Sequence, residues 1–187
     1  MVAPVLPPDR PWELEDLDAI PDDGNRYEIL QGELIVSPSP GSLHQLILGE
    51  LLGQFTIHLK EHPAGKAVVG PLNVMLTRFD IALPDLIYFR NEQAGHMSDR
   101  GFDGPPAFII EVVSPASAFY DRVRKATLYI HEGVEEYWIV EPDLKRVRRY
   151  TQPAPPDNPE DVTSGVMTSI VVPGYSINLD ELFAVSI

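Results

Sequence analysis

Two acidic residues stand in apolar stretches of this sequence, where a charged side chain is costly to bury. Asp85 has apolar residues on both sides, at 81–84 and 86–87, and Glu111 is the one charged residue in the run 108–113. A carboxylate in such a setting needs a cation, a metal ion or a proton to stay there. If the strands that carry these two acids are neighbours, their carboxylates converge.

Converging carboxylates favour a hard divalent cation such as Mg²⁺ or Mn²⁺. The chain of 187 residues contains no cysteine, which excludes disulfides and thiolate ligands and leaves carboxylates, histidine and backbone carbonyls as protein ligands. Mg²⁺ binds through one or two acidic oxygens, keeps several waters and leaves positions for a substrate phosphate. The pattern therefore favours a site for phosphate chemistry, which a nearby lysine would complete.

The segment after the second acid offers that lysine. Helix start and stop signals, a serine and a proline at 114–115 and Gly133, predict a helix between them. Along this helix, Asp121, Lys125 and Tyr129 are spaced four apart on a face other than the apolar one. We expect this polar row to point at the two acids.

Each of these signals also has a structural interpretation. Asp85, which follows a proline, suits the capping of a turn, and Glu111 suits an ion pair with a buried arginine. Asp121 with Lys125 is an ordinary pair of opposite charges four apart on a helix. His44 lies in a predicted helix, where a lone histidine is more often structural than catalytic. The residues alone leave these interpretations open.

The elements that must position these side chains follow from hydrophobic periodicity and turn residues. Apolar spacing predicts a long amphipathic helix from 42 to about 60, and the run 108–113 predicts a central strand covered on both faces. Strands before and after each long helix indicate a mixed α/β sheet with helices packed against it. The remaining predictions are strands at 27–30, 33–36, 67–70, 73–76, 86–89, 136–140, 146–150 and 168–172, a short helix at 12–20, and a surface loop beside Asp85 at 91–104.

Composition limits the class of protein. Hydrophobic residues make up 44% and charged residues 22% of the chain, and no break in composition divides it. We therefore expect a single domain over 1–187, with an irregular, proline-rich arm at 1–11. No apolar run approaches the roughly 18 residues of a membrane span, and the first residues do not resemble a signal peptide. The sequence thus predicts a cytoplasmic protein without a membrane partner.

The net charge of −14, from 28 acidic and 14 basic side chains, counts against a nucleic-acid enzyme, because such a field repels a phosphate backbone at long range. Half of the basic residues nevertheless lie close together along the chain. This group consists of Arg122, Arg124, Lys125, Lys145, Arg146, Arg148 and Arg149. The group fits either a local positive surface or a solvated helix face with a solvated hairpin.

The sequence resembles the bacterial Uma-type restriction endonuclease family, within the PD-(D/E)XK nuclease superfamily. The likeness runs through most of the chain and rests on six short motifs. These are Arg26-Tyr27-Glu28-Ile29 with Gly32-Glu33, Ser37-Pro38 with His44, Pro84-Asp85, Glu111-Val112-Val113-Ser114-Pro115, Asp121 with Lys125, and Gly133-Val134-Glu135-Glu136-Tyr137-Trp138. The resemblance implies a restriction endonuclease-like core: a central mixed sheet flanked by helices, with an N-terminal hairpin.

The resemblance also implies a metal site. Asp85 and Glu111 are expected as the metal ligands, with Mg²⁺ or Mn²⁺ as the cofactor. Glu28 is expected as a supporting acid on the hairpin side. The backbone carbonyl of Val112 is expected as a further oxygen ligand, as the equivalent position is in related nucleases.

Lys125 is the catalytic cation that the resemblance implies. The usual lysine of the E-X-K motif is missing, because Val113 occupies its position. The lysine function must then come from the following helix, a migration that the family also shows. Asp121 and His44 are expected in supporting roles, with His44 in contact with the substrate or with Glu28.

The function that follows is Mg²⁺-dependent cleavage of phosphodiester bonds in DNA. A homodimer is expected because nucleases of this class often cut two strands, and the hairpin from 137 to 150 offers an edge for pairing. One alternative is a catalytically silent binding or assembly module that keeps the fold, which the acidic charge suits. Another is a metal-dependent hydrolase of a small phosphoester, for which net charge matters less.

Overall fold

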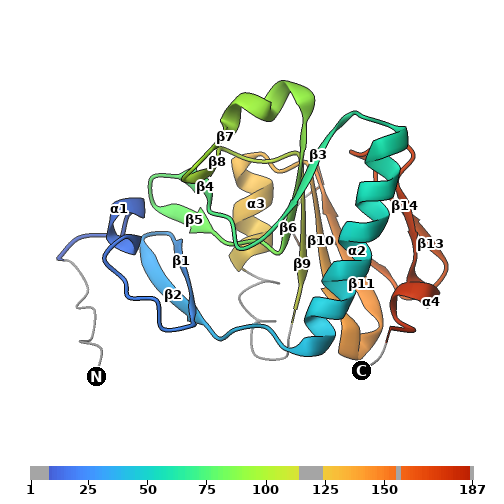
Figure 1. Cartoon of the computed structure of the whole chain (residues 1–187), viewed down its shortest axis with the longest axis horizontal. Helices are drawn as coiled ribbons and strands as arrows, with labels where there is room; N and C mark the ends of the chain where they lie inside the picture. Colours follow the sequence, from blue (N-terminus) through green and yellow to red (C-terminus); the bar gives the residue numbers. More distant parts are fainter. Residues whose placement is uncertain (1–8, 114–123, 155–156, 186–187) are drawn as a thin grey trace.

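The computed structural model describes residues 9–113, 124–154 and 157–185 (Figure 1). The helices in these ranges are α1 (Leu14–Leu17), α2 (Ser42–Glu61), α3 (Ala126–Glu132) and α4 (Leu179–Leu182), with 3₁₀ helices η1 (Asn91–His96) and η3 (Pro142–Leu144). The strands are β1 (Arg26–Leu30), β2 (Glu33–Ser37), β3 (Gly65–Val69), β4 (Val74–Thr77), β5 (Asp80–Ala82), β6 (Leu86–Arg90), β7 (Met97–Ser98), β8 (Gly101–Asp103), β9 (Phe108–Val112), β10 (Glu136–Glu141), β11 (Arg146–Thr151), β12 (Glu160–Val162), β13 (Val166–Thr168) and β14 (Ser176–Asn178).

Two six-stranded sheets organise the described part of the chain. The N-terminal sheet has the order β2-β1-β5-β4-β8-β7, and the central sheet has the order β12-β11-β10-β9-β6-β3. Each sheet contains one parallel pair among antiparallel neighbours, β4 with β8 and β9 with β10. These mixed sheets with their flanking helices confirm the predicted mixed α/β class.

The central sheet is covered on both faces. Residues Phe108, Ile110 and Val112 of β9 pack with Leu51 and Phe55 of α2 in one core cluster. Ile109 and Val113, on the opposite face of β9, belong to a second cluster that contains residues of α3 and of the N-terminal sheet. Figure 1 shows α3 between the two sheets and α2 on the far side of the central one. Because side chains alternate along a strand, Glu111 points toward α3.

Glu111 lies on β9, and Asp85 directly precedes β6, the neighbouring strand, so the condition for bringing the two acids together is met. β6 pairs with β9 in antiparallel register, with Leu86 opposite Ile110. Continuing this register by one residue sets Asp85 opposite Glu111. The sheet itself therefore brings the two carboxylates to one end of adjacent strands.

The N-terminal hairpin of β1 and β2 is also confirmed. Its two turn residues, Gln31 and Gly32, have φ angles of 55° and 74°, the positive values that a two-residue type I′ turn requires. The register pairs Leu30 with Glu33. Arg26 and Glu28, two apart on β1, share one face of the strand.

The described residues include the second half of the helix expected between 114 and 133. α3 ends at Gly133, whose φ of 107° is the left-handed conformation that closes a helix. The start signals at 114–115 and Asp121 lie outside the described residues. Lys125 directly precedes α3, and Tyr129 lies one turn further along it.

Two predictions about the chain path are wrong. The segment 91–104 is not an irregular loop beside Asp85: it forms η1, β7 and β8, and it leaves β6 at the end opposite Asp85. Strands of two and three residues are too short to produce a periodic signal. The expected strand 168–172 is mostly a turn, because the carboxylate of Glu136 and the hydroxyl of Ser169 accept the backbone N–H groups of 170–172 that a ladder would use.

The hairpin of β10 and β11 forms as predicted, but its edge is not free. β12 pairs with β11, so the strand expected to pair with a second copy already has a neighbour. The arginines of this hairpin are matched by local acids, which favours the solvated-hairpin interpretation over a positive surface. The ion pairs are Arg146 with Glu141 and Asp161, Arg148 with Asp161, and Arg149 with Glu160. Among the described residues, no helix is long and apolar enough to cross a membrane.

We predict that Gly32→Ala destabilises the protein by roughly 1–2 kcal/mol, the cost of a left-handed conformation for a residue with a Cβ. The added atom would also lie 2.6 Å from Cβ of Pro11. The control is Gly49→Ala in α2, where a Cβ meets nothing within 4 Å and helix propensity predicts a gain of about 0.5–1 kcal/mol. Urea unfolding of both variants measures the difference, and equal stabilities would contradict the turn assignment.

Candidate active site

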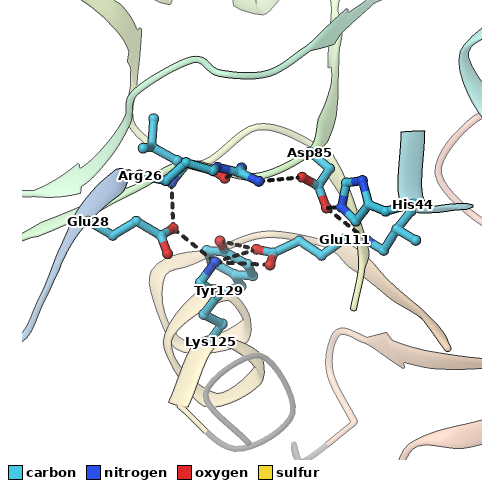
Figure 2. A network of polar contacts seen from close by, with 9 residues as sticks. Arg26, Glu28, His44, Asp85, Glu111, Lys125 and Tyr129 are labelled. Atoms are coloured by element: carbon cyan, nitrogen blue, oxygen red, sulfur yellow. Dashed lines mark hydrogen bonds and ion pairs between the residues drawn. The ribbon is translucent and has the colours of Figure 1, made fainter. Parts of the chain in front are cut away.

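Asp85 is a buried carboxylate with three donors, shown in Figure 2 between Arg26 and His44. Its Oδ1 accepts a hydrogen bond from Nη1 of Arg26 at 3.0 Å. Its Oδ2 is 2.9 Å from Nε2 of His44 and accepts the backbone N–H of Val112 at 2.9 Å. Burial alone would raise the pKa of Asp85, but His44, Arg26 and the Val112 N–H outweigh it and lower this pKa below its ordinary value. Asp85 is therefore held as a carboxylate and does more than cap a turn.

Glu111 is buried on the other side of the site and, among the described residues, pairs with a lysine. Nζ of Lys125 lies 2.9 and 3.1 Å from its two carboxylate oxygens, and the hydroxyl of Tyr129 donates to Oε1 at 2.7 Å. Lys125 also lies 2.8 Å from Oε1 of Glu28, which accepts the N–H of Leu83. The ammonium group thus sits between two acids from different sheets.

The backbone of Val112 faces the same side as Asp85. Val113 donates its N–H to Val140 in β10, whereas Val112 donates to Asp85 on the β6 side. In a strand, the N–H and C=O of one residue point to the same side, so the carbonyl of Val112 also faces Asp85. This orientation is the one that a third oxygen ligand would need.

His44 lies in the first turn of α2 and contacts Asp85 rather than Glu28. Because Asp85 is ionised, Nε2 of His44 carries the proton that the hydrogen bond between them needs. The other ring nitrogen, Nδ1, is buried and has no hydrogen-bond partner in the described part of the chain. A buried polar atom without a partner costs free energy, which marks Nδ1 as a place for a water molecule or a substrate group.

The structure brings together most of the residues singled out from the sequence. Asp85 contacts His44 and the backbone of Val112, and Lys125 contacts Glu28 and Glu111. Arg26 and the backbone of Leu83 link these two sets into one network, because Arg26 contacts Asp85 and the Leu83 carbonyl, and the Leu83 N–H donates to Glu28. Tyr129, from the polar row of the same helix, joins it at Glu111, as the spacing from Lys125 predicts. Asp121 lies outside the described residues. The roles of these residues in metal binding or catalysis stay predictions.

Arg26 is the residue of this network that sequence reasoning passed over. It appeared in a family motif but was given no role. The available signal is the two-residue spacing from Glu28, which sets both side chains on one face of β1. A strand that presents an acid and a base to the same side, next to other buried acids, predicts participation by both.

The donor set fits a hard divalent cation in its chemistry. Asp85 and Glu111 lie at the same end of neighbouring strands, and Mg²⁺ needs only one or two acidic oxygens and fills its remaining positions with water. No group of three or more acidic or histidine side chains that could hold a metal is found in the ranges described.

Comparisons with known proteins agree with this fold. The family model Uma2, described as "Putative restriction endonuclease", matches residues 14–180. A solved structure of "a putative nuclease belonging to DUF820" from Anabaena variabilis ATCC 29413 superposes with a TM-score of 0.77 at 18% sequence identity, covering 93% of this chain and 98% of that one. At this identity the likeness concerns the fold, which confirms the expected nuclease-type core. No curated protein matches the sequence.

We predict strong coupling between Lys125 and Glu111 in the stability of the metal-free protein. Lys125→Met leaves acids buried without their cation and should cost about 3–5 kcal/mol, whereas adding Glu111→Gln should cost less than the sum of the single changes, with a coupling of about 1–3 kcal/mol. Urea unfolding in a chelator measures this cycle. The control pairs Lys125→Met with Glu136→Gln, a buried acid that contacts other residues and should be additive. Additivity of Lys125 with Glu111 would contradict the network.

Proposed function

The chain belongs to the Uma2 family, described as putative restriction endonuclease, and we propose that its nuclease-type function is metal-dependent hydrolysis of phosphodiester bonds in DNA. The observation that carries this proposal is the position of Lys125. Its ammonium lies within 2.8–3.1 Å of the carboxylates of Glu28 and Glu111. Glu111 is on β9, and Asp85 directly precedes the neighbouring strand β6. A lysine between two buried acids, with a third buried acid at the same end of the neighbouring strand, matches the needs of phosphate hydrolysis.

The carboxylates of Asp85 and Glu111, with the carbonyl of Val112, would hold the divalent ion, Mg²⁺ or Mn²⁺. When bound, the ion supplies Lewis acidity toward the scissile phosphate and the attacking water. The protein keeps Asp85 ready for this task through the lowered pKa that His44, Arg26 and Val112 maintain against burial. A carboxylate that is already ionised needs no proton release before it binds a cation.

Lys125 is the group suited to the chemical step. Hydrolysis joins the water oxygen to phosphorus, breaks one P–O bond and leaves an oxygen that takes up a proton. The ammonium of Lys125 orients the water and offsets the negative charge that develops on the phosphate. Glu28 and Tyr129 position the site around it: Glu28 contacts Nζ directly, and Tyr129 fixes the carboxylate of Glu111.

His44 acts through Asp85. Its ring lies 2.9 Å from Oδ2 of Asp85 and fixes the rotamer of that carboxylate, as partners of metal-binding residues commonly do. Asp121 keeps its place in this proposal only as an expected supporting residue.

A small phosphoester is the second candidate substrate, and a specific observation favours it. The net charge is −14, and the arginines of the β10–β11 hairpin are already paired with acids. A short substrate meets only the field of the site, whereas a DNA duplex meets the field of the whole surface. Binding of DNA should weaken steeply with salt, and binding of a small phosphoester should not.

We predict that the protein nicks supercoiled plasmid in the presence of Mg²⁺ or Mn²⁺ and not in a chelator. Glu111→Gln and Lys125→Met should each lower the rate by about 100-fold or more, because each removes a group that acts in the chemical step. Glu136→Gln is the matched control. Glu136 is a buried carboxylate at the start of β10 that contacts none of the site residues named above, so nicking should stay near the native rate. All variants are first checked for folding by circular dichroism.

Hydrolysis of a small phosphodiester without plasmid nicking, lost in the same two variants, would move the substrate assignment to the second candidate. Metal binding without hydrolysis of either substrate would favour a catalytically silent module. Nicking that survives in Glu111→Gln and Lys125→Met would contradict the proposed site.

A further inference from the structure

The two oxygens of Asp85 are occupied very differently. Oδ2 has two short contacts, with the His44 ring and the Val112 N–H, and both belong to the rigid frame of α2 and β9. Oδ1 contacts Nη1 of Arg26 at 3.0 Å. Each carboxylate oxygen has about two lone-pair positions. A metal ion that binds Asp85 must therefore use Oδ1, the oxygen that Arg26 contacts.

Arg26 is the more exposed of the two cations in the network. Its side chain is 24% exposed, whereas that of Lys125 is 5% exposed. Besides Asp85, its guanidinium is held by the carbonyl of Leu83 at 2.7 Å, which is a neutral acceptor. Lys125, by contrast, contacts two carboxylates. If one of the two cations moves when a further positive charge enters, it is Arg26.

A divalent ion that binds Asp85 would be repelled by the positive charge of Arg26. An ion on Oδ1 and a guanidinium on the same oxygen are like charges within a few ångströms, in a site where burial weakens screening. Without a metal, Arg26 supplies the positive charge that Asp85 needs. With a metal, the same contact becomes repulsive, and the guanidinium gains more from an anion elsewhere.

We infer that Arg26 is a built-in competitor of the metal ion, which releases Asp85 when the ion binds and then engages a phosphate of the DNA substrate. This inference rests on the proposed function and adds a residue role to it. A planar guanidinium donates two parallel hydrogen bonds to a phosphate, which suits this second contact. Metal and substrate then bind cooperatively, because the phosphate accepts the cation that the metal displaces.

A merely structural role for Arg26 predicts the opposite result. If the arginine served only to orient Asp85, its removal would loosen the carboxylate and weaken metal binding. If it competes with the metal, its removal strengthens metal binding. The sign of the change therefore distinguishes the two roles.

The test is Mn²⁺ titration by calorimetry, without nucleic acid, on the native chain, Arg26→Gln, Arg26→Lys and Arg90→Gln. Arg26→Gln should bind Mn²⁺ about tenfold more tightly or better, because one like charge has gone. Arg26→Lys keeps the charge and should bind close to the native affinity. Arg90→Gln is the control. Arg90 is 30% exposed, lies at the end of β6 far from Asp85 and pairs with Glu135, so its loss should change the affinity for Mn²⁺ little.

A second measurement tests the phosphate contact. A short DNA duplex should raise the affinity for Ca²⁺ by about fivefold or more in the native chain and by less than about twofold in Arg26→Gln, with the duplex shown intact on a gel. Equal or weaker Mn²⁺ binding by Arg26→Gln would overturn the competitor role while leaving the proposed metal site in place. Absence of Mn²⁺ binding by the native chain would instead overturn the proposed function, and this inference with it.

Discussion

The candidate site depends on one constraint: three carboxylates are buried at one end of the central sheet, and buried charges must be matched. Glu28, Asp85 and Glu111 come from β1, from the start of β6 and from β9, and each is less than a tenth exposed. Arg26 and Lys125 supply two positive charges among them, and backbone N–H groups supply hydrogen bonds. Because an unmatched charge in the interior costs several kcal/mol, these elements must close on one another for the protein to fold.

The same matching links stability to function. In the proposed function, the groups that stabilise the metal-free protein also serve phosphate hydrolysis: ionised acids for a cation, a lysine for developing charge and an arginine for a phosphate. Among the residues that the structure describes, the three acids of the site outnumber its arginine and lysine by one negative charge. A divalent ion reverses that sign, and one phosphate charge then brings the site back to neutrality. This sequence of charge states gives a physical reason for metal and substrate to bind together.

Much of the site was predictable because its signals are local in the sequence. Glu111 stands out as the one acid in a buried run, and the four-residue spacing of Lys125 and Tyr129 sets both on the helix face that meets it. The pairing of Arg26 with Asp85 was not predictable in this way. It joins residues 59 apart through the packing of the hairpin against the loop before β6, and no spacing rule reports that contact.

In the fold, too, some elements follow from their own residues and others depend on residues far along the chain. Long periodic elements such as α2 and buried runs such as β9 follow from their own residues. The short strands β5, β7 and β8 depend on neighbours that complete their ladders, so their sequences carry little signal. The turn at 169–172 depends on a single buried acid, Glu136, from a distant strand.

The most direct test of the central claim is a crystal structure of the protein with Mn²⁺, with diffraction data collected at the manganese absorption edge. We predict an anomalous peak about 2 Å from a carboxylate oxygen of Asp85 and of Glu111, with the carbonyl of Val112 in contact. We also predict that Arg26 no longer contacts Oδ1 of Asp85. A fully occupied manganese position elsewhere, or no peak beside these carboxylates while Arg26 and Lys125 keep their ion pairs, would contradict it.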